Sequence, residues 1–276
     1  MTVREALRSA EELLLGAGVP DARLDAEYLL AGVLDAPRLL VCLSGDTVLS
    51  EGRLELFFSQ VMRRGRREPL QYILGTQPFM GFEFRVTPDV LIPRNDTETL
   101  CEQATLCAPE GGTALDLCTG SGALAVALKR LRPDLTVTAT DLSPAALAVA
   151  RQNADALDAA VDFREGDLFD PVWDERFDLI LSNPPYIPSG ELPGLQEEVM
   201  REPDMALDGG PDGLCFYRRI AEEAPGHLKS CGALLLEIGC DQGEAVRALL
   251  GEGFRDIQIY RDLNGLERVV KAVLKD

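Results

Sequence analysis

The sequence predicts an α/β protein with an open, mostly parallel sheet of seven strands, preceded by a small helical module. Three observations support this. Strand and helix patterns alternate from about residue 112 onward. Two of the strands, FDLILSN (177–183) and GALLLEIG (232–239), are continuous apolar runs, as is typical of parallel strands covered on both faces. The first 70 residues instead repeat apolar side chains at helical spacing.

The N-terminal part reads as three helices. The first covers residues 2–17, with a capping box formed by Thr2 and Glu5. Its inward positions are Val3, Leu7, Ala10, Leu14 and Ala17. The second covers 21–34, and its inward positions are Leu24, Tyr28 and Ala31. The third follows Ser50 as its N-cap, and its apolar face holds Leu54, Phe57, Phe58, Val61 and Met62.

The pattern changes after this module. In residues 72–94, Phe82, Phe84 and Val86 alternate with charged residues, and glycines and prolines break the run. This predicts a β-hairpin. We therefore expect a helical domain over 1–71, a hairpin linker over 72–92 and an α/β domain over 93–276.

In the α/β domain, TALDLC (113–118), LTVTATD (135–141) and VDFREGD (161–167) are the other predicted parallel strands. Helices are predicted over 122–131 and 143–157, the second with Ser143 as N-cap and Pro144 at its first position. The end of the chain, 257–274, reads as two strands joined by a turn at Asn264 and Gly265, which gives a terminal antiparallel hairpin.

Charge is spread unevenly over the 276 residues, whose net charge is −19. Residues 1–85 carry 10 basic and 12 acidic side chains, so the remainder has a net charge of −17. This disfavours a general nucleic-acid binder, which normally shows a basic surface. The one basic run, RRGRR at 63–67, is interpreted as a solvated helix end.

Cysteine and histidine usage points to a reducing compartment without a metal centre. The seven cysteines include no C-x-x-C pair, and the single histidine is His227, for which a structural or surface role is expected. The first residues include acidic side chains, and no long apolar run is present. We expect a cytoplasmic protein that binds neither metal nor membrane.

Polar and glycine residues stand where the predicted strands end, which is where ligands bind in such sheets. GSGALA (120–125) with Asp141 fits a dinucleotide-binding turn, and NAD is one interpretation. S-adenosylmethionine is favoured for two reasons. Asp116 precedes the glycines, where it can orient the loop and a methionine amino group, and the loop ends in small residues that let a nucleoside approach.

The fourth strand ends in Asn183, Pro184, Pro185 and Tyr186. Amide and exocyclic amine nitrogens are poor nucleophiles, because their lone pairs are delocalised. The Asn183 side-chain oxygen and the Pro184 carbonyl are suitable acceptors for the two N–H bonds of such a nitrogen. They would bind it more tightly as it gains positive charge during methyl transfer. The prolines fix the carbonyl direction, and Tyr186 supplies a flat face.

These motifs resemble the HemK/PrmC family, the protein-glutamine methyltransferases of peptide chain release factors. The resemblance covers nearly the whole length. It is carried by YILGTQPFMGFEFRVTPDVLIPRNDTETL (72–100), LDLCTGSGALAVAL (115–128), SNPPYIP (182–188), EPDMALDGGPDGLCFYRRI (202–220), EIGCDQGEAV (237–246) and RDLNGLERVV (261–270).

The resemblance implies a class I, Rossmann-like methyltransferase that moves a methyl group from S-adenosylmethionine to the glutamine amide nitrogen of the Gly-Gly-Gln motif in class-one release factors. The helical domain would recognise the body of the release factor. The cofactor residues would be Asp116, Cys118, Thr119, Gly120, Ser121, Gly122, Asp141, Asp167, Leu168 and Asn183. Asn183 through Tyr186 would grip the glutamine, with Arg94, Thr97 and Phe79 near the active site.

Three positions depart from the family pattern. Cys118 stands where many methyltransferases have glycine, so we expect no positive φ there. Asn95 replaces a common proline, and Leu168 replaces an aromatic residue found in some members. A structural role is expected for Cys118, because no neighbour in the sequence would activate its thiol.

Two alternatives remain at this point. A DNA or RNA amino-methyltransferase shares Asn-Pro-Pro-Tyr, but the acidic charge opposes phosphate binding. A cofactor-binding adaptor without activity is disfavoured by the combination of a donor loop and an acceptor motif. The prediction is therefore a monomeric enzyme with a protein substrate and no stable nucleic-acid partner.

Overall fold

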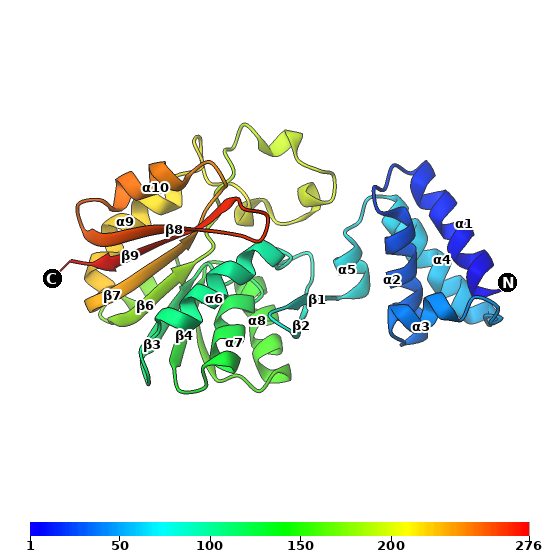
Figure 1. Ribbon diagram of the computed structural model, residues 1–276, viewed down its shortest axis with the longest axis horizontal. Coiled ribbons are helices and arrows are strands. Elements are labelled where there is room, and N and C mark those ends of the chain that lie inside the picture. Colours follow the sequence, from blue (N-terminus) through cyan, green and yellow to red (C-terminus); the bar gives the residue numbers. More distant parts are fainter. Residues whose placement is uncertain (276) are drawn as a thin grey trace. The chain divides into compact units, whose positions relative to one another are not determined.

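The computed structural model describes residues 1–275, and these form two compact units. The first contains residues 1–76 together with the short segment 196–201, and the second contains 77–195 and 202–275. Figure 1 shows the chain coloured along its length. The first unit is therefore built from two pieces of sequence that are far apart.

The first unit is helical. Its helices are α1 (Val3–Gly16), α2 (Ala22–Leu34), α3 (Arg38–Leu43), α4 (Glu51–Gly65) and α5 (Leu70–Leu74), and segment 196–201 adds the 3₁₀ turn η4 (Val199–Arg201). The predicted capping box is confirmed, since the Thr2 hydroxyl accepts from the Glu5 N–H at 3.3 Å and Glu5 accepts from the Thr2 N–H at 2.8 Å. The short helices α3 and α5 were not predicted.

The inward face of α2 was predicted correctly only at Ala31. Leu24 and Tyr28 are 40% and 41% exposed, and the buried apolar positions are Ala22, Ala26, Leu29, Leu30 and Ala31. Two acidic residues of this helix are also buried, because arginines pair with both: Arg64 with Asp25, and Arg23 and Arg38 with Glu27. The buried side of α2 therefore combines apolar residues with two ion-paired carboxylates, which the spacing of apolar residues alone does not reveal.

Helix α4 follows the prediction only in part. Phe57 and Val61 are buried, whereas Met62 is 52% exposed. Ser50 occupies the N-cap position, but its side chain makes no capping hydrogen bond. The face that packs inward is narrower than the five residues predicted for it.

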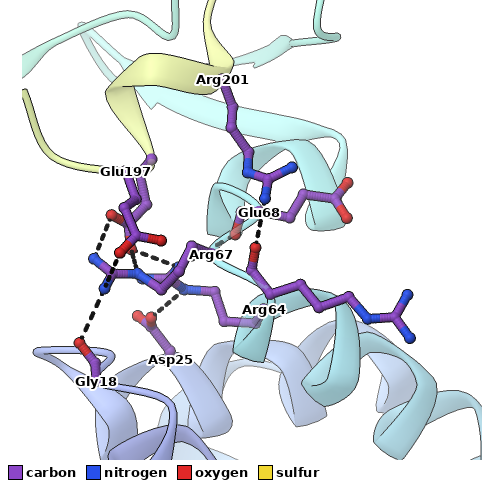
Figure 2. A network of polar contacts seen from close by, with 9 residues as sticks. Gly18, Asp25, Arg64, Arg67, Glu68, Glu197 and Arg201 are labelled. Carbon is purple, nitrogen blue, oxygen red and sulfur yellow. Dashed lines mark hydrogen bonds and ion pairs between the residues drawn. The ribbon is translucent and has the colours of Figure 1, made fainter. Parts of the chain in front are cut away.

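The basic run at the end of α4 is a solvated helix end only in part, because Arg63 and Arg66 are exposed but Arg64 and Arg67 are not. Arg64 is buried, and its guanidinium pairs with Asp25 at 2.7 Å and with Glu198 of segment 196–201 at 2.7 Å. Arg67 binds both oxygens of the Glu198 carboxylate, with its Nε donating to Oε1 at 2.8 Å and its Nη2 donating to Oε2 at 2.6 Å. Figure 2 shows Asp25, Arg64 and Arg67 in this network, next to Glu197 and Arg201 of the segment.

Further contacts complete this ion-pair network. Arg67 also donates to the Gly18 carbonyl at 3.2 Å, and Arg201 donates to the Arg66 carbonyl at 2.7 Å. Burial alone would raise the pKa of Glu198, but the hydrogen bonds from Arg67 and Arg64 outweigh it and lower that pKa to about 2. Segment 196–201 is thus fastened to the helical unit by charge-assisted hydrogen bonds, which are stronger than neutral ones.

The hairpin predicted after the helices is present but short. It consists of β1 (Thr76–Phe79) and β2 (Phe82–Arg85). Met80 and Gly81 between them have φ values of +51° and +78°. Two consecutive residues with positive φ are what a two-residue type I′ turn requires.

The second unit contains the predicted sheet. Its strands are β3 (Thr113–Leu117), β4 (Thr136–Asp141), β5 (Val161–Glu165), β6 (Phe177–Ser182), β7 (Leu228–Glu237), β8 (Phe254–Arg261) and β9 (Glu267–Leu274). Their order is β5-β4-β3-β6-β7-β9-β8, with only β8 and β9 paired antiparallel to their neighbours. The seven-stranded, mostly parallel sheet with a terminal hairpin is confirmed.

Helices cover both faces of this sheet (Figure 1). They are α6 (Glu98–Cys107), α7 (Ala123–Leu131), α8 (Pro144–Ala156), α9 (Cys215–His227) and α10 (Gly243–Leu250), joined by the 3₁₀ turns η1 (Asn95–Thr97), η2 (Asp170–Val172), η3 (Leu192–Gly194) and η5 (Asp204–Ala206). One apolar core lies between the sheet and α6–α8, and the other lies between the sheet and α9 and α10. His227 ends α9 with its ring stacked on Phe169, a structural position as expected.

The strand order determines where a ligand can bind. From β3 the chain moves outward to β4 and β5, and then returns to place β6 on the other side of β3. The crevice beyond the carboxyl ends of such neighbouring strands is the usual binding site in open α/β sheets. Within residues 1–275, no helix is both long enough and apolar enough to cross a membrane.

Candidate active site

A pocket lies at this switch point, and most of its lining comes from the loops that follow four parallel strands. It encloses about 710 Å³, part of which is open to solvent. The predicted site residues that line it are Cys118 and Gly120 after β3, Asp141 after β4, Asp167 and Leu168 after β5, and Asn183 and Pro185 after β6.

The loop after β3 is organised by Asp116, which is fully buried in the strand. Its Oδ2 accepts from the Thr119 hydroxyl at 2.6 Å. Its Oδ1 has no hydrogen-bond partner among the described residues. Burial raises the pKa of Asp116 to about 7, even though the Thr119 hydroxyl lowers it. A buried carboxylate oxygen without a partner is costly and indicates a binding role.

Cys118 corrects one prediction, because its φ is +58° although it is not a glycine. The tight return of the loop toward Gly120 and Gly122, with φ of +55° and +78°, requires three positive φ values within five residues. At Gly122 no side chain fits, since a Cβ would lie 3.0 Å from that of Ala150. Burial raises the pKa of the Cys118 thiol, which therefore stays protonated and is not a nucleophile.

Two further carboxylates border the pocket. Asp141 accepts from the Gly120 and Ser143 N–H groups, both at 2.8 Å, so it ties the first two strand ends together. Burial raises its pKa, although these two N–H groups lower it. Asp167 pairs with Arg219 of α9 at 2.9 Å. The neighbouring Leu168 is buried, with a φ of +46°.

The Asn-Pro-Pro-Tyr corner is held rigidly. The Asn183 side-chain amide donates to the Thr97 hydroxyl at 3.3 Å. The Tyr186 carbonyl accepts from the Gln242 side chain at 2.9 Å. Two glycines of the DGGPDGL stretch pack on the same corner, since a Cβ at Gly209 or Gly213 would lie 2.7 Å or 2.3 Å from the Tyr186 backbone. The two proline rings are buried.

The other predicted residues are placed as follows. Some predicted residues belong to β3 or to the loops after β3 and β6 but do not line the pocket itself: Asp116, Thr119, Ser121, Gly122, Pro184 and Tyr186. Arg94 pairs with the buried Glu202, which also accepts from the Ile92 N–H at 3.0 Å. Phe79 is 1% exposed and packs edge-to-face on Phe84 in the core, so it does not border the pocket.

Several lining residues were missed by the sequence reasoning. They include Val90 and Leu91 before η1, Pro203, Met205 and Ala206 around η5, and Phe216 at the start of α9. The segments that carry them lie far from the strand ends in sequence and show no period that would single them out. The one signal was that they all lie in the stretches 72–100 and 202–220, which carry the family resemblance. Residues 1–275 contain no cluster of three His, Cys, Asp or Glu side chains suited to a metal ion.

Comparisons with known proteins match both the helical unit and the α/β unit. Residues 5–75 match the family model of the PrmC N-terminal domain, and residues 96–211 match that of the methyltransferase small domain. A crystal structure of a methyltransferase from Pyrococcus furiosus is 17% identical with a TM-score of 0.55, covers 82% of this chain and 98% of its own, and shows the fold alone.

Two curated relatives are much closer in sequence. The release factor glutamine methyltransferase of Geobacter sulfurreducens is 46% identical, over 98% of this chain and 95% of its own length. That of Moorella thermoacetica is 44% identical, over 100% of both chains. Their similarity extends through the helical unit and the methyltransferase unit alike. The chain therefore belongs to the family of release factor glutamine methyltransferases.

Proposed function

We propose that this enzyme transfers a methyl group from S-adenosylmethionine to the side-chain amide nitrogen of the glutamine in the Gly-Gly-Gln motif of class-one peptide chain release factors. The observation that carries the proposal is the convergence of the β3 glycine loop and the Asn-Pro-Pro-Tyr corner on one pocket. A donor site and an acceptor site for a planar nitrogen are thus side by side.

The residues present fit S-adenosylmethionine. The unpartnered Oδ1 of the buried Asp116 suits an ammonium group, which is the charge that a methionine amino group carries. Asp141 uses one lone pair of each oxygen for Gly120 and Ser143, which leaves two for ribose hydroxyls. Asp167 and Leu168 would flank the adenine, with Phe216 also in the pocket wall. When bound, the cofactor supplies an electrophilic methyl group on a sulfonium.

The chain's own part in the reaction is to hold the acceptor nitrogen. The Asn183 Oδ1 and the Pro184 carbonyl accept its two N–H bonds, and Tyr186 packs against the planar amide. As the nitrogen becomes positive, these acceptors bind it more strongly, which lowers the barrier. Pro185 fixes the Pro184 carbonyl in advance, so little ordering remains for the reaction itself. Positioning of this kind can contribute several kcal/mol, up to about 7–11.

The helical unit would recognise the body of the release factor, and the enzyme would act as a cytoplasmic monomer without a stable nucleic-acid partner. The net charge of −17 beyond residue 85 supports a protein substrate over DNA or RNA, whose binding depends on neutralising phosphates. Arg94 remains a candidate substrate contact, since it lies in the segment that leads into Thr97.

Labelled S-adenosylmethionine offered with a release factor, DNA and ribosomal RNA side by side tests this function. Label is expected in the release factor only, and it should be lost when the glutamine of the Gly-Gly-Gln motif is replaced by alanine. Label in nucleic acid alone would contradict the protein substrate. Cofactor binding without any transfer would favour the non-catalytic adaptor instead.

A further inference from the structure

A buried polar cluster lies behind the Asn-Pro-Pro-Tyr corner. Its centre is Glu237, the last residue of β7, which is 1% exposed. Thr97 of η1 is 5% exposed, and Arg268 of β9 is 8% exposed. Burying a carboxyl group this deeply is expensive unless it has a specific task.

The sheet register places Glu237 beside the catalytic corner. Strands β6 and β7 are parallel neighbours, and Ser182 pairs with Leu236. Asn183 and Glu237 are the next residues along these two strands, so they lie side by side where the strands end at the same edge of the sheet. Thr97 connects them, since its hydroxyl accepts from the Asn183 Nδ2 at 3.3 Å. The same hydroxyl lies close enough to the Glu237 carboxyl group to lower its pKa by hydrogen bonding.

Donor and acceptor chemistry fixes the direction of the hydrogen bonds from Asn183 through Thr97 to Glu237. A carboxylate only accepts, so the single hydroxyl proton of Thr97 must point to Glu237. The Thr97 oxygen can then only accept from Asn183, which forces the Asn183 Nδ2 toward Thr97 and leaves Oδ1 for the substrate. We propose that Glu237 is a positioning residue that, through the Thr97 hydroxyl, holds the Asn183 carboxamide in its productive orientation. This inference rests on the proposed function and names how its acceptor atom is oriented.

The surroundings of Glu237 make its charge titratable near neutral pH. Burial raises its pKa to about 7, although the Thr97 hydroxyl, the Arg268 charge and the Tyr186 hydroxyl lower it, and Asp96 raises it further. Tyr217 of α9 donates to the backbone carbonyl of Glu237 at 2.8 Å, and so leaves the carboxyl group alone. Oε2 has no partner among the described residues.

Protonation of the Glu237 carboxylate should therefore allow the Asn183 carboxamide to leave its productive orientation. A protonated carboxyl group can donate to Thr97, whose own proton is then free to turn toward Asn183 and allow the carboxamide to flip. We expect kcat of the wild-type enzyme to rise with pH through about 7. The acceptor amide itself does not titrate in this range, and saturating cofactor limits the contribution of Asp116, the buried carboxyl group of β3.

Three variants test the positioning role on the full chain. Thr97→Val removes the hydroxyl at constant shape, Thr97→Ser keeps it, and Glu237→Gln removes the charge at constant volume. Exposed Glu244 of α10 supplies the matched control, Glu244→Gln. The measurements are kcat for release factor methylation between pH 6 and 9, by experimental choice, and the Kd of S-adenosylmethionine by calorimetry.

Thr97→Val is expected to lower kcat about 100-fold, as small misplacements in active sites do, with the cofactor Kd within about twofold. Thr97→Ser should retain most of the activity, and Glu237→Gln should lose the rise of kcat near pH 7. An unchanged kcat in Thr97→Val, equal losses in the valine and serine variants, or an unaltered pH profile in Glu237→Gln would each overturn the inference. If Thr97→Val does not fold, as judged by lost cofactor binding, the Glu237→Gln profile decides. A wild-type enzyme that leaves release factor unmethylated would instead refute the proposed function.

Discussion

Asn183 is the residue on which the proposed chemistry depends most directly. It lies in the pocket wall at the end of β6, and its amide nitrogen is already engaged by Thr97. Asn183→Ala removes the acceptor oxygen while leaving the Asp116 and Asp141 contacts of the cofactor loop intact. Methyl transfer should fall by at least about 100-fold, the usual cost of removing an oxyanion-hole-type group. The Kd of S-adenosylmethionine, measured by calorimetry, should stay within a few-fold; near-normal turnover would refute the acceptor role.

Asp116 should make the stability of the enzyme depend on pH. Burial raises its pKa from 3.8 to about 7, so the folded chain holds a proton that the unfolded chain has lost between these values. The free energy of unfolding should therefore fall as the pH rises from about 4 to about 7. One pKa unit corresponds to about 1.4 kcal/mol, so this loss should be on the order of 1 kcal/mol or more.

Asp116→Asn should remove this part of the pH dependence. Urea unfolding at pH 5 and pH 8 without cofactor checks it, with the exposed Asp155→Asn of α8 as control. Identical pH dependence in wild type and Asp116→Asn would contradict the assigned pKa shift.

Single residues also mark where sequence reasoning fails. The types of residue in the glycine loop and in Asn-Pro-Pro-Tyr predicted the part of the pocket wall that lies at the strand ends, because the proposed chemistry demands them locally. The positive φ of Cys118 was not predictable, since it follows from how the whole loop returns over β3. The partners of Glu237 were equally hidden, because strand register brings them together over more than 50 residues.

At the scale of elements, the DGGPDGL stretch packs against the backbone of the Asn-Pro-Pro-Tyr corner and holds it in place. A Cβ at Gly213, where φ is +72°, would lie 2.3 Å from the Tyr186 carbonyl and 2.7 Å from the Gln242 amide. Gly213→Ala should therefore displace Tyr186, lower kcat at least about tenfold and cost about 1–3 kcal/mol of stability.

Gly190→Ala in the same connection is the matched control, because nothing lies within 4 Å and its φ is not positive. Its stability should stay within about 0.5 kcal/mol of wild type in thermal unfolding. Equal effects of the two substitutions on kcat would show that packing of Gly213 against Tyr186 does not position the Asn-Pro-Pro-Tyr corner.

The ion-pair network of Figure 2 joins segment 196–201 to α2 and α4. Glu198→Ala leaves the buried Arg64 with Asp25 alone and Arg67 without its bidentate partner. Breaking a buried pair in this way should cost roughly 2 kcal/mol or more, since it leaves a charge unpaired. Faster amide hydrogen exchange in α2 and α4 is the expected readout.

Glu197→Ala is the control, because that side chain is 60% exposed and 3.7 Å from Arg67; its cost should be below about 1 kcal/mol. Since the pKa of Glu198 is lowered to about 2 from 4.5, its stabilisation should also fade as the pH drops through that window. Equal protection in both variants would show that the network contributes little.

Elements were predicted unevenly. The strands and the helices α1, α7 and α8 follow local periodicity and caps, so their types were predictable. Helices α3 and α5, of 6 and 5 residues, are too short for a period to appear. The face of α2 was misjudged because ion pairs with Arg64, Arg23 and Arg38 bury two of its acidic residues. Such long-range pairing leaves no trace in an apolar pattern.

Over the whole molecule, the fold was the most predictable property. Alternating strands and helices with continuous apolar runs admit few sheet topologies, and connection rules reduce them further. The pocket was predictable only on the side formed by strand ends. Other lining residues, which include Pro203, Met205 and Ala206, belong to the irregular connection between β6 and α9, whose path depends on the finished sheet.

The division of the chain into units has a consequence for how the enzyme can be taken apart. Residues 196–201 belong to the helical unit, yet both of their flanks belong to the methyltransferase unit. A fragment that begins at residue 77 would keep this segment and lose the arginines that neutralise it. Neither unit can therefore be cut out as one continuous piece of sequence. Truncation or gene fusion at the hairpin would leave the acidic segment without its arginine partners, directly before Glu202, the partner of Arg94.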